Sequence, residues 1–234
     1  VRVTAEKIEI NDNSSIQAIG EKSGGLIEIG GSWQNNNKDV YQATTTKIAE
    51  GASLDASAYD FGDGGEIVVW SNIHDTNSKT SVKGTLKAEG GKIKGNGGRI
   101  ETSGRALDIN NIKISTKSTA GVDGQWLIDP YNITISNNGG SNSDINGSYT
   151  ATGNSAVVDV GTLESALGSS NVTVFTGSGG SQSGDIDVDA PITLSSSNTL
   201  TLDSNRNINI NQNITLSSNG GLVLEPGSNN VNGS

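Results

Sequence analysis

Three aspartates alternate with apolar residues in one short segment: Asp185, Asp187 and Asp189. Alternation with Ile186 and Val188 predicts a strand that carries all three carboxylates on its outer face. Carboxylates ligate Ca²⁺, and paired carboxylates cleave polysaccharides by acid–base catalysis. Twenty-two residues further on, the equivalent positions hold neutral amides: Asn207, Asn209 and Asn211. Neutral side chains stacked beside the carboxylates favour the interpretation that the aspartates are exposed residues without a ligand. Neither a metal site nor catalysis is therefore expected.

The other residues with chemical potential are isolated. His74 is the single histidine of a chain without cysteine, so neither a zinc site nor a Ser–His pair is supported, and a plain surface histidine is expected. Trp33, Trp70 and Trp126 could stack on sugars, but Trp70 and Trp126 adjoin apolar strand residues, which favours a core or coil-end role. No glycine motif precedes a helix as phosphate binding requires, and no cofactor is expected.

Charge is unevenly distributed along the chain. The net charge of −10 disfavours nucleic acid as a partner, yet residues 79–117 carry nine basic against three acidic side chains, a net of +6. If Ile93 and Ile100 point inward, their charged neighbours point outward, and stacked coils could join them into a ridge. One interpretation is scattered cations that prevent lateral aggregation. The other is a site for an anionic glycan, sulfated or sialylated, formed by Lys87, Lys92, Lys94 and Arg99.

Asn-x-Ser/Thr sequons are candidate glycosylation sites, although many arise by chance in a chain this rich in Asn, Ser and Thr. They are Asn13, Asn132, Asn146, Asn171, Asn213 and Asn232.

Elements that could position these residues are clearest between Ile186 and Leu224, where six apolar-x-apolar triplets follow one another. A shift of 22 residues superimposes three of them on the other three: Ile186 on Ile208, Ile192 on Ile214 and Leu200 on Leu222. Three strands per 22 residues predict a solenoid with three-sided coils, because single triplets bury their apolar face only by stacking. We therefore expect an all-β, right-handed parallel β-helix of about eight to ten coils, with these six residues inward.

A looser repeat covers residues 14–104. Its glycine pairs precede an isoleucine by two residues: Gly24-Gly25, Gly64-Gly65, Gly90-Gly91 and Gly97-Gly98. We expect these isoleucines to point inward and the glycines to turn sharp corners with positive φ. Residues 1–10 already have the pattern of a coil side.

The chain is expected to be one β-helix segment, 1–234, with polar excursions at about 33–48, 71–83 and 136–156. Leu163, Ala166 and Leu167 fall on one helical face, which predicts a short helix over 162–167, packed on the side of the rod or across a coil. No apolar run is long enough for a membrane-spanning helix, so no membrane insertion is expected. Because the chain has no Met, we expect it to be a fragment of a longer protein.

Several phrases resemble one family. They are residues 54–57, 64–70, 98–104, 124–135 and 161–174. Gly124-Gln-Trp-Leu-Ile-Asp-Pro-Tyr-Asn-Ile-Thr-Ile135 is similar to a phrase that recurs in that family. In combination these phrases are similar to the exoproteins of bacterial two-partner secretion, which include filamentous-haemagglutinin-like and high-molecular-weight adhesins. The resemblance covers about residues 50–224 and lacks the family's N-terminal secretion domain.

This resemblance implies secretion to the bacterial cell surface through an outer-membrane two-partner transporter, which would recognise a region absent here. It implies a non-catalytic adhesin that contacts a host receptor or glycan. Two alternatives share the scaffold: an exoprotein for haem acquisition that binds a host haem carrier, and the stalk of a contact-dependent toxin.

Overall fold

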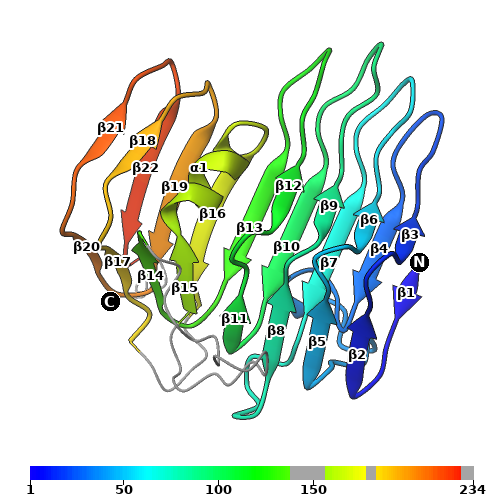
Figure 1. Ribbon diagram of the computed structural model, residues 1–234, viewed down its shortest axis with the longest axis horizontal. Helices are drawn as coiled ribbons and strands as arrows, with labels where there is room; N and C mark the ends of the chain where they lie inside the picture. The colour runs from blue at the N-terminus through cyan, green and yellow to red at the C-terminus, as the bar shows by residue number, and fades with distance from the viewer. Residues whose placement is uncertain (138–155, 178–182, 228–234) are drawn as a thin grey trace, which may run out of the picture.

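The protein is a parallel β-helix, seen in a computed structural model that describes residues 1–137, 156–177 and 183–227. Its strands run across the long axis and stack along it from the N-terminal to the C-terminal coil (Figure 1). Every strand pairing in these ranges is parallel, as the repeat predicts. Within the described residues, no helix is both long enough and apolar enough to cross a membrane.

One side of the coils forms a single sheet, here named the long sheet. Its strands in the described ranges are β1 (Arg2–Val3), β4 (Leu26–Ile29), β7 (Glu66–Trp70), β10 (Arg99–Ser103), β13 (Gln125–Asp129), β16 (Asn171–Thr176), β19 (Thr199–Ser204) and β22 (Gly221–Pro226).

The second and third sides are interrupted halfway along the rod. The second side consists of β2 (Lys7–Ile10), β5 (Thr45–Ile48), β8 (Lys79–Val82) and β11 (Ala106–Asp108), followed by β15 (Ala156–Asp159), β14 (Ile133–Ser136), β17 (Ile186–Val188) and β20 (Ile208–Ile210). The third side consists of β3 (Ser15–Gln17), β6 (Ser53–Asp55), β9 (Thr85–Lys87) and β12 (Lys113–Ser115), then α1 (Val160–Leu167), β18 (Ile192–Leu194) and β21 (Ile214–Leu216).

The 22-residue register is confirmed. Ile186 pairs with Ile208, Ile192 with Ile214 and Leu200 with Leu222. The first member of each pair is fully buried, whereas the second is only partly buried, because no described coil packs on its far side. The step along the long sheet is 22 residues only from Leu200 to Leu222 and reaches 46 from Trp126 to Val172, because turns and excursions lengthen the other coils.

Glycine is required at the glycine pairs for a different physical reason from the one expected. None of Gly24, Gly65 or Gly98 has positive φ. A Cβ on Gly24 would instead lie 1.9 Å from the Ala56 carbonyl oxygen of the next coil, and one on Gly98 would lie 2.0 Å from the Gly65 oxygen. These glycines are therefore required by the close approach of stacked backbones. The isoleucines that follow at 27, 67 and 100 are fully buried, as predicted.

Helix α1 begins at Val160, two residues earlier than predicted, because the Asp159 side chain accepts a hydrogen bond from the Thr162 amide and caps it. Leu163, Ala166 and Leu167 are buried in the solenoid core. The helix contacts β12 on one side and β18 on the other, so it takes the place of one strand on the third side.

The predicted excursions are too long. The first was predicted over 33–48, but its last four residues form strand β5, which begins at Thr45. The second, predicted over 71–83, contains strand β8 (Lys79–Val82). Both strands were missed because Thr, Ser and Lys occupy them with few apolar residues. Of the third, 136–156, residues 138–155 lie outside the described residues.

Residues 30–44, here named the first excursion, fold back over the outer face of the long sheet. They contain the 3₁₀ turn η1 (Trp33–Asn35). Gly31 packs on the indole of Trp70, and the Trp70 Nε1 donates to Gln42 Oε1 at 3.2 Å. Val68 and Trp70 are therefore buried although they point away from the solenoid interior, and Val68 is fully inaccessible. The rod thus has a second, smaller apolar layer outside its core.

Candidate functional site

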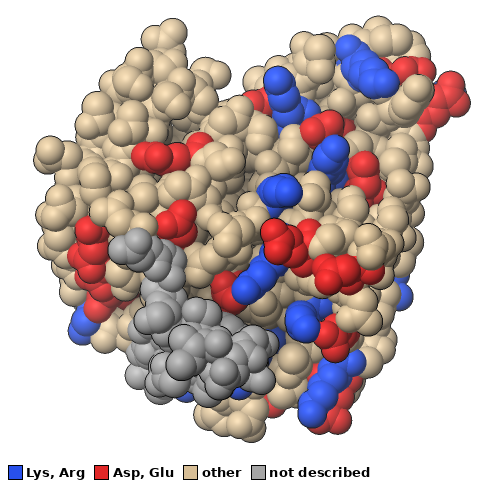
Figure 2. Space-filling model, in the orientation of Figure 1, with Lys and Arg blue, Asp and Glu red and all other residues tan. Residues whose placement is uncertain are grey.

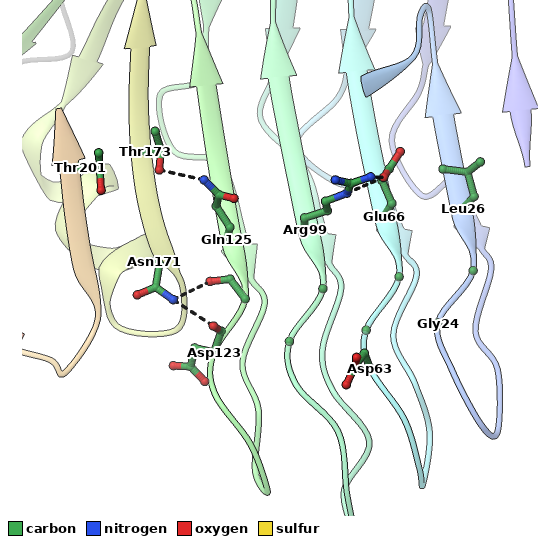
Figure 3. Close-up of a pocket in the computed structure, with 16 residues that line it drawn as sticks. Gly24, Leu26, Asp63, Glu66, Arg99, Asp123, Gln125, Asn171, Thr173 and Thr201 are labelled. Carbon is green, nitrogen blue, oxygen red and sulfur yellow. Dashed lines mark hydrogen bonds and ion pairs between the residues drawn. The ribbon is translucent and has the colours of Figure 1, made fainter. Parts of the chain in front are cut away.

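A shallow groove of about 950 Å³ crosses the stacked strands at the corner where the long sheet begins (Figure 3). Its floor consists of glycine pairs from successive coils, and its wall consists of outward residues in the first half of the strands. The wall residues are Leu26, Glu66, Arg99, Gln125, Asn171, Thr173 and Thr201. They come from β4, β7, β10, β13, β16 and β19, so at about 4.8 Å per coil the groove is roughly 24 Å long.

Charges along this groove are largely paired. The Arg99 guanidinium forms an ion pair with Glu66, with Nε 2.5 Å from Oε2, and its cationic carbon lies 4.3 Å from the Trp33 ring centre. The Asp123 carboxylate accepts bonds from the Ser118 amide and the Asn198 side chain. Three carboxylates (Asp63, Glu66 and Asp123) against one cation leave a net charge of −2 on the lining. The groove therefore disfavours polyanions.

The second half of the wall offers neutral hydrogen-bonding groups. Gln125 Nε2 donates to Thr173 Oγ1 at 2.9 Å, which leaves the second amide proton and the carbonyl oxygen of Gln125 for a ligand. Thr201 stands next to Thr173 in the register. The sequence contained a signal for this groove in its repeated glycine pairs, which were attributed to corners alone.

Glu101 is the most unusual ionisable group on the molecule. It points outward from β10, yet its side chain is inaccessible to solvent. Its Oε2 accepts a hydrogen bond from the Gln34 amide at 2.7 Å, whereas its Oε1 and the Oδ1 of Asn35 are both buried without a partner. Burial, opposed by the Gln34 bond and reinforced by Asp129 and Glu66, raises the pKa of Glu101 well above its usual value. Sequence reasoning missed it because the first excursion supplies the burial.

Asp129, on the neighbouring strand β13, is a second buried carboxyl group. It is 6% exposed, and burial raises its pKa to about 7. Tyr131 follows it, with its hydroxyl 3.3 Å from Nδ1 of His74 and the Arg105 guanidinium over its ring. Burial also raises the pKa of Tyr131. His74 is exposed, as expected, but this contact ties its loop to the residues that follow β13.

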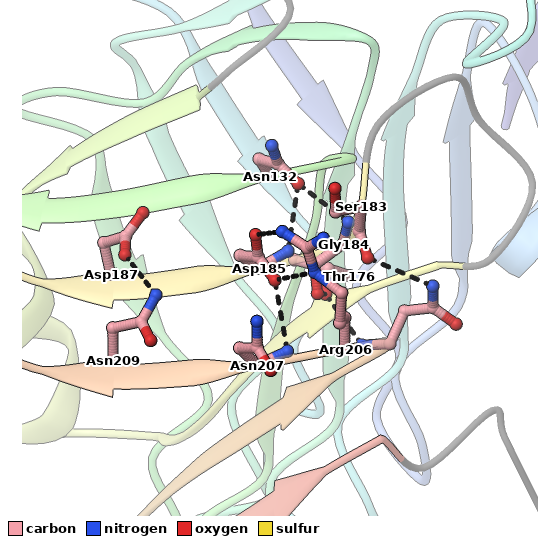
Figure 4. Close-up of polar contacts among 10 residues, drawn as sticks. Asn132, Thr176, Ser183, Gly184, Asp185, Asp187, Arg206, Asn207 and Asn209 are labelled. Atoms are coloured by element: carbon pink, nitrogen blue, oxygen red, sulfur yellow. Dashed lines mark hydrogen bonds and ion pairs between the residues drawn. The ribbon is translucent and has the colours of Figure 1, made fainter.

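The aspartate row forms the ladder that the sequence predicted (Figure 4). Asn209 Nδ2 donates to Asp187 at 2.7 Å, and Asn211 Nδ2 donates to Asp189 at the same distance. Asp185 forms a bidentate pair with Arg206 and accepts from the Asn207 amide, and these bonds, Arg206 first, lower its pKa. These amide and guanidinium contacts stabilise the stack of coils. No group of three or more potential metal ligands lies together within the described residues.

The four proposed glycan-binding cations lie around the circumference of one coil rather than along the rod. Arg99 is on the long sheet and pairs with Glu66, Lys87 is on β9 beside Asp55, and the Lys92 ammonium lies 4.2 Å from the Tyr59 ring centre. Figure 2 shows basic and acidic side chains interspersed over the N-terminal half of the visible face.

The expectation that Ile93 points inward is wrong. Ile93 is 61% exposed, because residues 90–96 form a turn that stacks on the turn of the preceding coil, through the Ile93 amide and the Asp60 carbonyl. Lys92 and Lys94 therefore lie at this turn rather than on a coil side.

Heparin retention tests whether these cations act together. If they do, the variant with Lys87, Lys92, Lys94 and Arg99 changed to Gln is expected to fold normally and lose retention on a heparin column. Retention of the native chain should then weaken steeply with salt, because exposed charges are screened within about 8 Å at physiological ionic strength. If the native chain passes through the column unretained at low salt, the four residues do not form a site for heparin-like glycans and contribute to solubility alone.

The tryptophans have three different environments. Trp126 lies in the solenoid core and donates to Thr102 Oγ1 at 3.1 Å, and Trp70 is buried beneath the first excursion. Trp33 is partly exposed beside Arg99 at the groove. A role in the core is thus confirmed for Trp126, whereas Trp70 belongs to the outer layer.

The described sequon asparagines differ in accessibility. Asn13 and Asn213 are exposed, whereas Asn171 donates to the Asp123 and Gly124 carbonyls, and Asn132 accepts from the Gly184 and Asp185 amides. A glycan on Asn171 would have to replace bonds that join two coils. Asn146 and Asn232 lie outside the described residues. Glycosylation stays a prediction at all six positions.

A scan against protein-family models and a search of curated proteins found no match to this chain. The resemblance to two-partner-secretion exoproteins therefore stays a prediction and enters below only as support for a proposal.

Proposed function

We propose that this chain is a non-catalytic segment of a secreted or cell-surface bacterial adhesin that attaches to host cells or glycans. The observation that carries the proposal is the groove along the long sheet, because an open slot that crosses six strands suits an extended chain-like ligand. The resemblance of the coil phrases to two-partner-secretion exoproteins supports the same proposal. A location at the bacterial cell surface and an outer-membrane two-partner transporter as a partner belong to the proposal.

The lining favours a neutral, hydroxyl-rich polymer as that ligand. Amide and hydroxyl side chains at Gln125, Thr173 and Thr201 form hydrogen bonds with sugar hydroxyls, and the partly exposed Leu26 offers an apolar surface to a sugar ring. A net charge of −2 on the lining opposes sulfated or sialylated chains at this place. A linear polysaccharide that lies along the rod would meet equivalent wall positions in successive coils.

Cell attachment tests the function. Beads coated with the chain are expected to bind epithelial cells, and soluble chain is expected to compete. If the beads instead retain a haem carrier from serum, the haem-acquisition alternative replaces the proposal. Beads that retain neither cells nor serum proteins indicate a toxin stalk.

Filling the groove tests the site. Thr201 is a partly exposed outward residue of β19, so Thr201→Tyr is expected to fold normally and to reduce cell attachment at least about tenfold. Thr215→Tyr is the matched control, because Thr215 is an exposed threonine of β21 on another side of the coil. Equal attachment by both variants would remove the groove from the proposal.

A further inference from the structure

The contact between Glu101 and the first excursion carries an inference that is independent of ligand binding. The backbone amide of Gln34, in the first excursion, donates a hydrogen bond to Oε2 of Glu101 at 2.7 Å. Its other oxygen, Oε1, is buried without a partner, and so is Oδ1 of Asn35, the residue next to Gln34. A buried acceptor that lacks a donor is costly, and protonating a carboxyl oxygen turns it from an acceptor into a donor.

We propose that Glu101 Oε1 faces Asn35 Oδ1 and carries a proton in the closed molecule, and that this proton fastens the first excursion to the long sheet through Asn35. Loss of the proton leaves a buried carboxylate facing an acceptor, so the excursion then detaches from the outer face. Detachment uncovers Val68 and Trp70, the apolar residues that the excursion covers.

Backbone geometry around the contact agrees with a fastened segment. Gln34 and Asn35 are consecutive non-glycine residues in the left-handed region, with φ of 44° and 51°. Side chains seldom adopt this conformation unless surrounding contacts enforce it. The enforcing contacts around η1 are the Gln34–Glu101 bond and the stacking of Trp33 beneath Arg99. A released excursion would relax from this conformation.

The charged groups that face Glu101 favour its neutral form on balance. Asp129 on β13 and Glu66 on β7 raise its pKa, and Arg99 on its own strand lowers it, although Arg99 is already paired with Glu66. Glu28 on β4 lies in the same outward row of the long sheet as Glu101, and it forms an ion pair with Arg2. From the excursion, the contact that acts on the carboxyl is the Gln34 amide, which lowers the pKa less than burial raises it.

An alternative arrangement makes a distinct prediction. If the Asn35 amide were turned by half a rotation, its Nδ2 would donate to Glu101, and an ionised carboxylate would hold the excursion. Replacing Glu101 with Gln separates the two. The Gln side chain mimics the protonated acid, because its carbonyl accepts from Gln34 and its amide donates to Asn35 Oδ1, but it cannot mimic a carboxylate.

Hydrogen exchange of peptides covering residues 30–44, corrected for intrinsic rates, measures the release. In the native chain, protection is expected to fall at least tenfold between pH 5 and pH 9, whereas in Glu101→Gln it should stay at the pH 5 level throughout. Glu66→Gln is the matched control for removal of a carboxylate, and Asp129→Asn is the control for the second buried acid. Both controls are expected to keep the pH dependence.

Three results would overturn the proposal. They are constant protection in the native chain, an unchanged pH dependence in Glu101→Gln, and an excursion that is open at all pH values in Glu101→Gln. Should that variant fail to fold, the ¹³C shift of the native Glu101 carboxyl decides, because an ionised carboxyl group under conditions where residues 30–44 are protected contradicts the proposal.

Discussion

Replacing Ile67 with Asp is expected to unfold the chain at room temperature. Ile67 is fully buried in the middle of the long sheet, where its register partners are Ile27 and Ile100, both fully buried. The substitution removes a core side chain and places an acidic group without a partner among apolar residues. We expect a loss of about 5 kcal/mol or more, which equals the whole stability of many domains. Denaturant unfolding followed by circular dichroism measures it.

Ile208→Asp is the matched control for that prediction. Ile208 has the same inward direction, but its described partner is Ile186 alone, and it is only partly buried. Water can therefore reach the new carboxylate, and the loss should be less than half of that at Ile67. Equal losses at the two positions would contradict the burial gradient along the rod, and no loss at Ile67 would contradict the register.

Stability is expected to fall as pH rises from about 4 to about 7. Burial raises the pKa of Asp129 from 3.8 to about 7, so in this window the folded chain retains a proton that the unfolded chain has lost. The stability is fully present below the unfolded pKa and declines until the folded pKa is reached. About three pKa units at 1.36 kcal/mol each give an upper limit of about 4 kcal/mol. The slope of unfolding free energy against pH measures it.

Asp129→Asn isolates that contribution, because an amide does not titrate. The variant is expected to lose the part of the slope that Asp129 supplies and to be more stable than the native chain at pH 8, whereas Glu101, whose pKa burial also raises, keeps its own part. Asp187→Asn is the matched control, because it removes a carboxylate that lies outside the core and donates nothing to the long sheet. A slope of the same size in Asp129→Asn as in the native chain would contradict the assignment to Asp129.

The glycine pairs show how a correct pattern can have a mistaken cause. Their repetition identified the coils and the inward isoleucines that follow at 27, 67 and 100. Their conformation could not be deduced, because at Gly24, Gly65 and Gly98 the atoms that exclude a Cβ belong to a neighbouring coil, far away in sequence. The prediction that Ile93 points inward is wrong for a related reason. Its glycine pair lies in a turn, and a turn has the same local pattern as a coil corner.

The sequence by itself determined the repeat, the register, the inward columns and the helix, because each follows from side chains that recur at fixed spacing along the chain. Period-2 triplets and a helical face are local patterns, and stacking only multiplies them. The tertiary structure alone decided which outward residues are exposed to solvent. Glu101, Val68 and Trp70 occupy outward strand positions, which alternation assigns to solvent, yet the first excursion folds back and buries them. Desolvation by a distant segment changes the pKa of a carboxyl group, and no pattern around Glu101 records that segment's path.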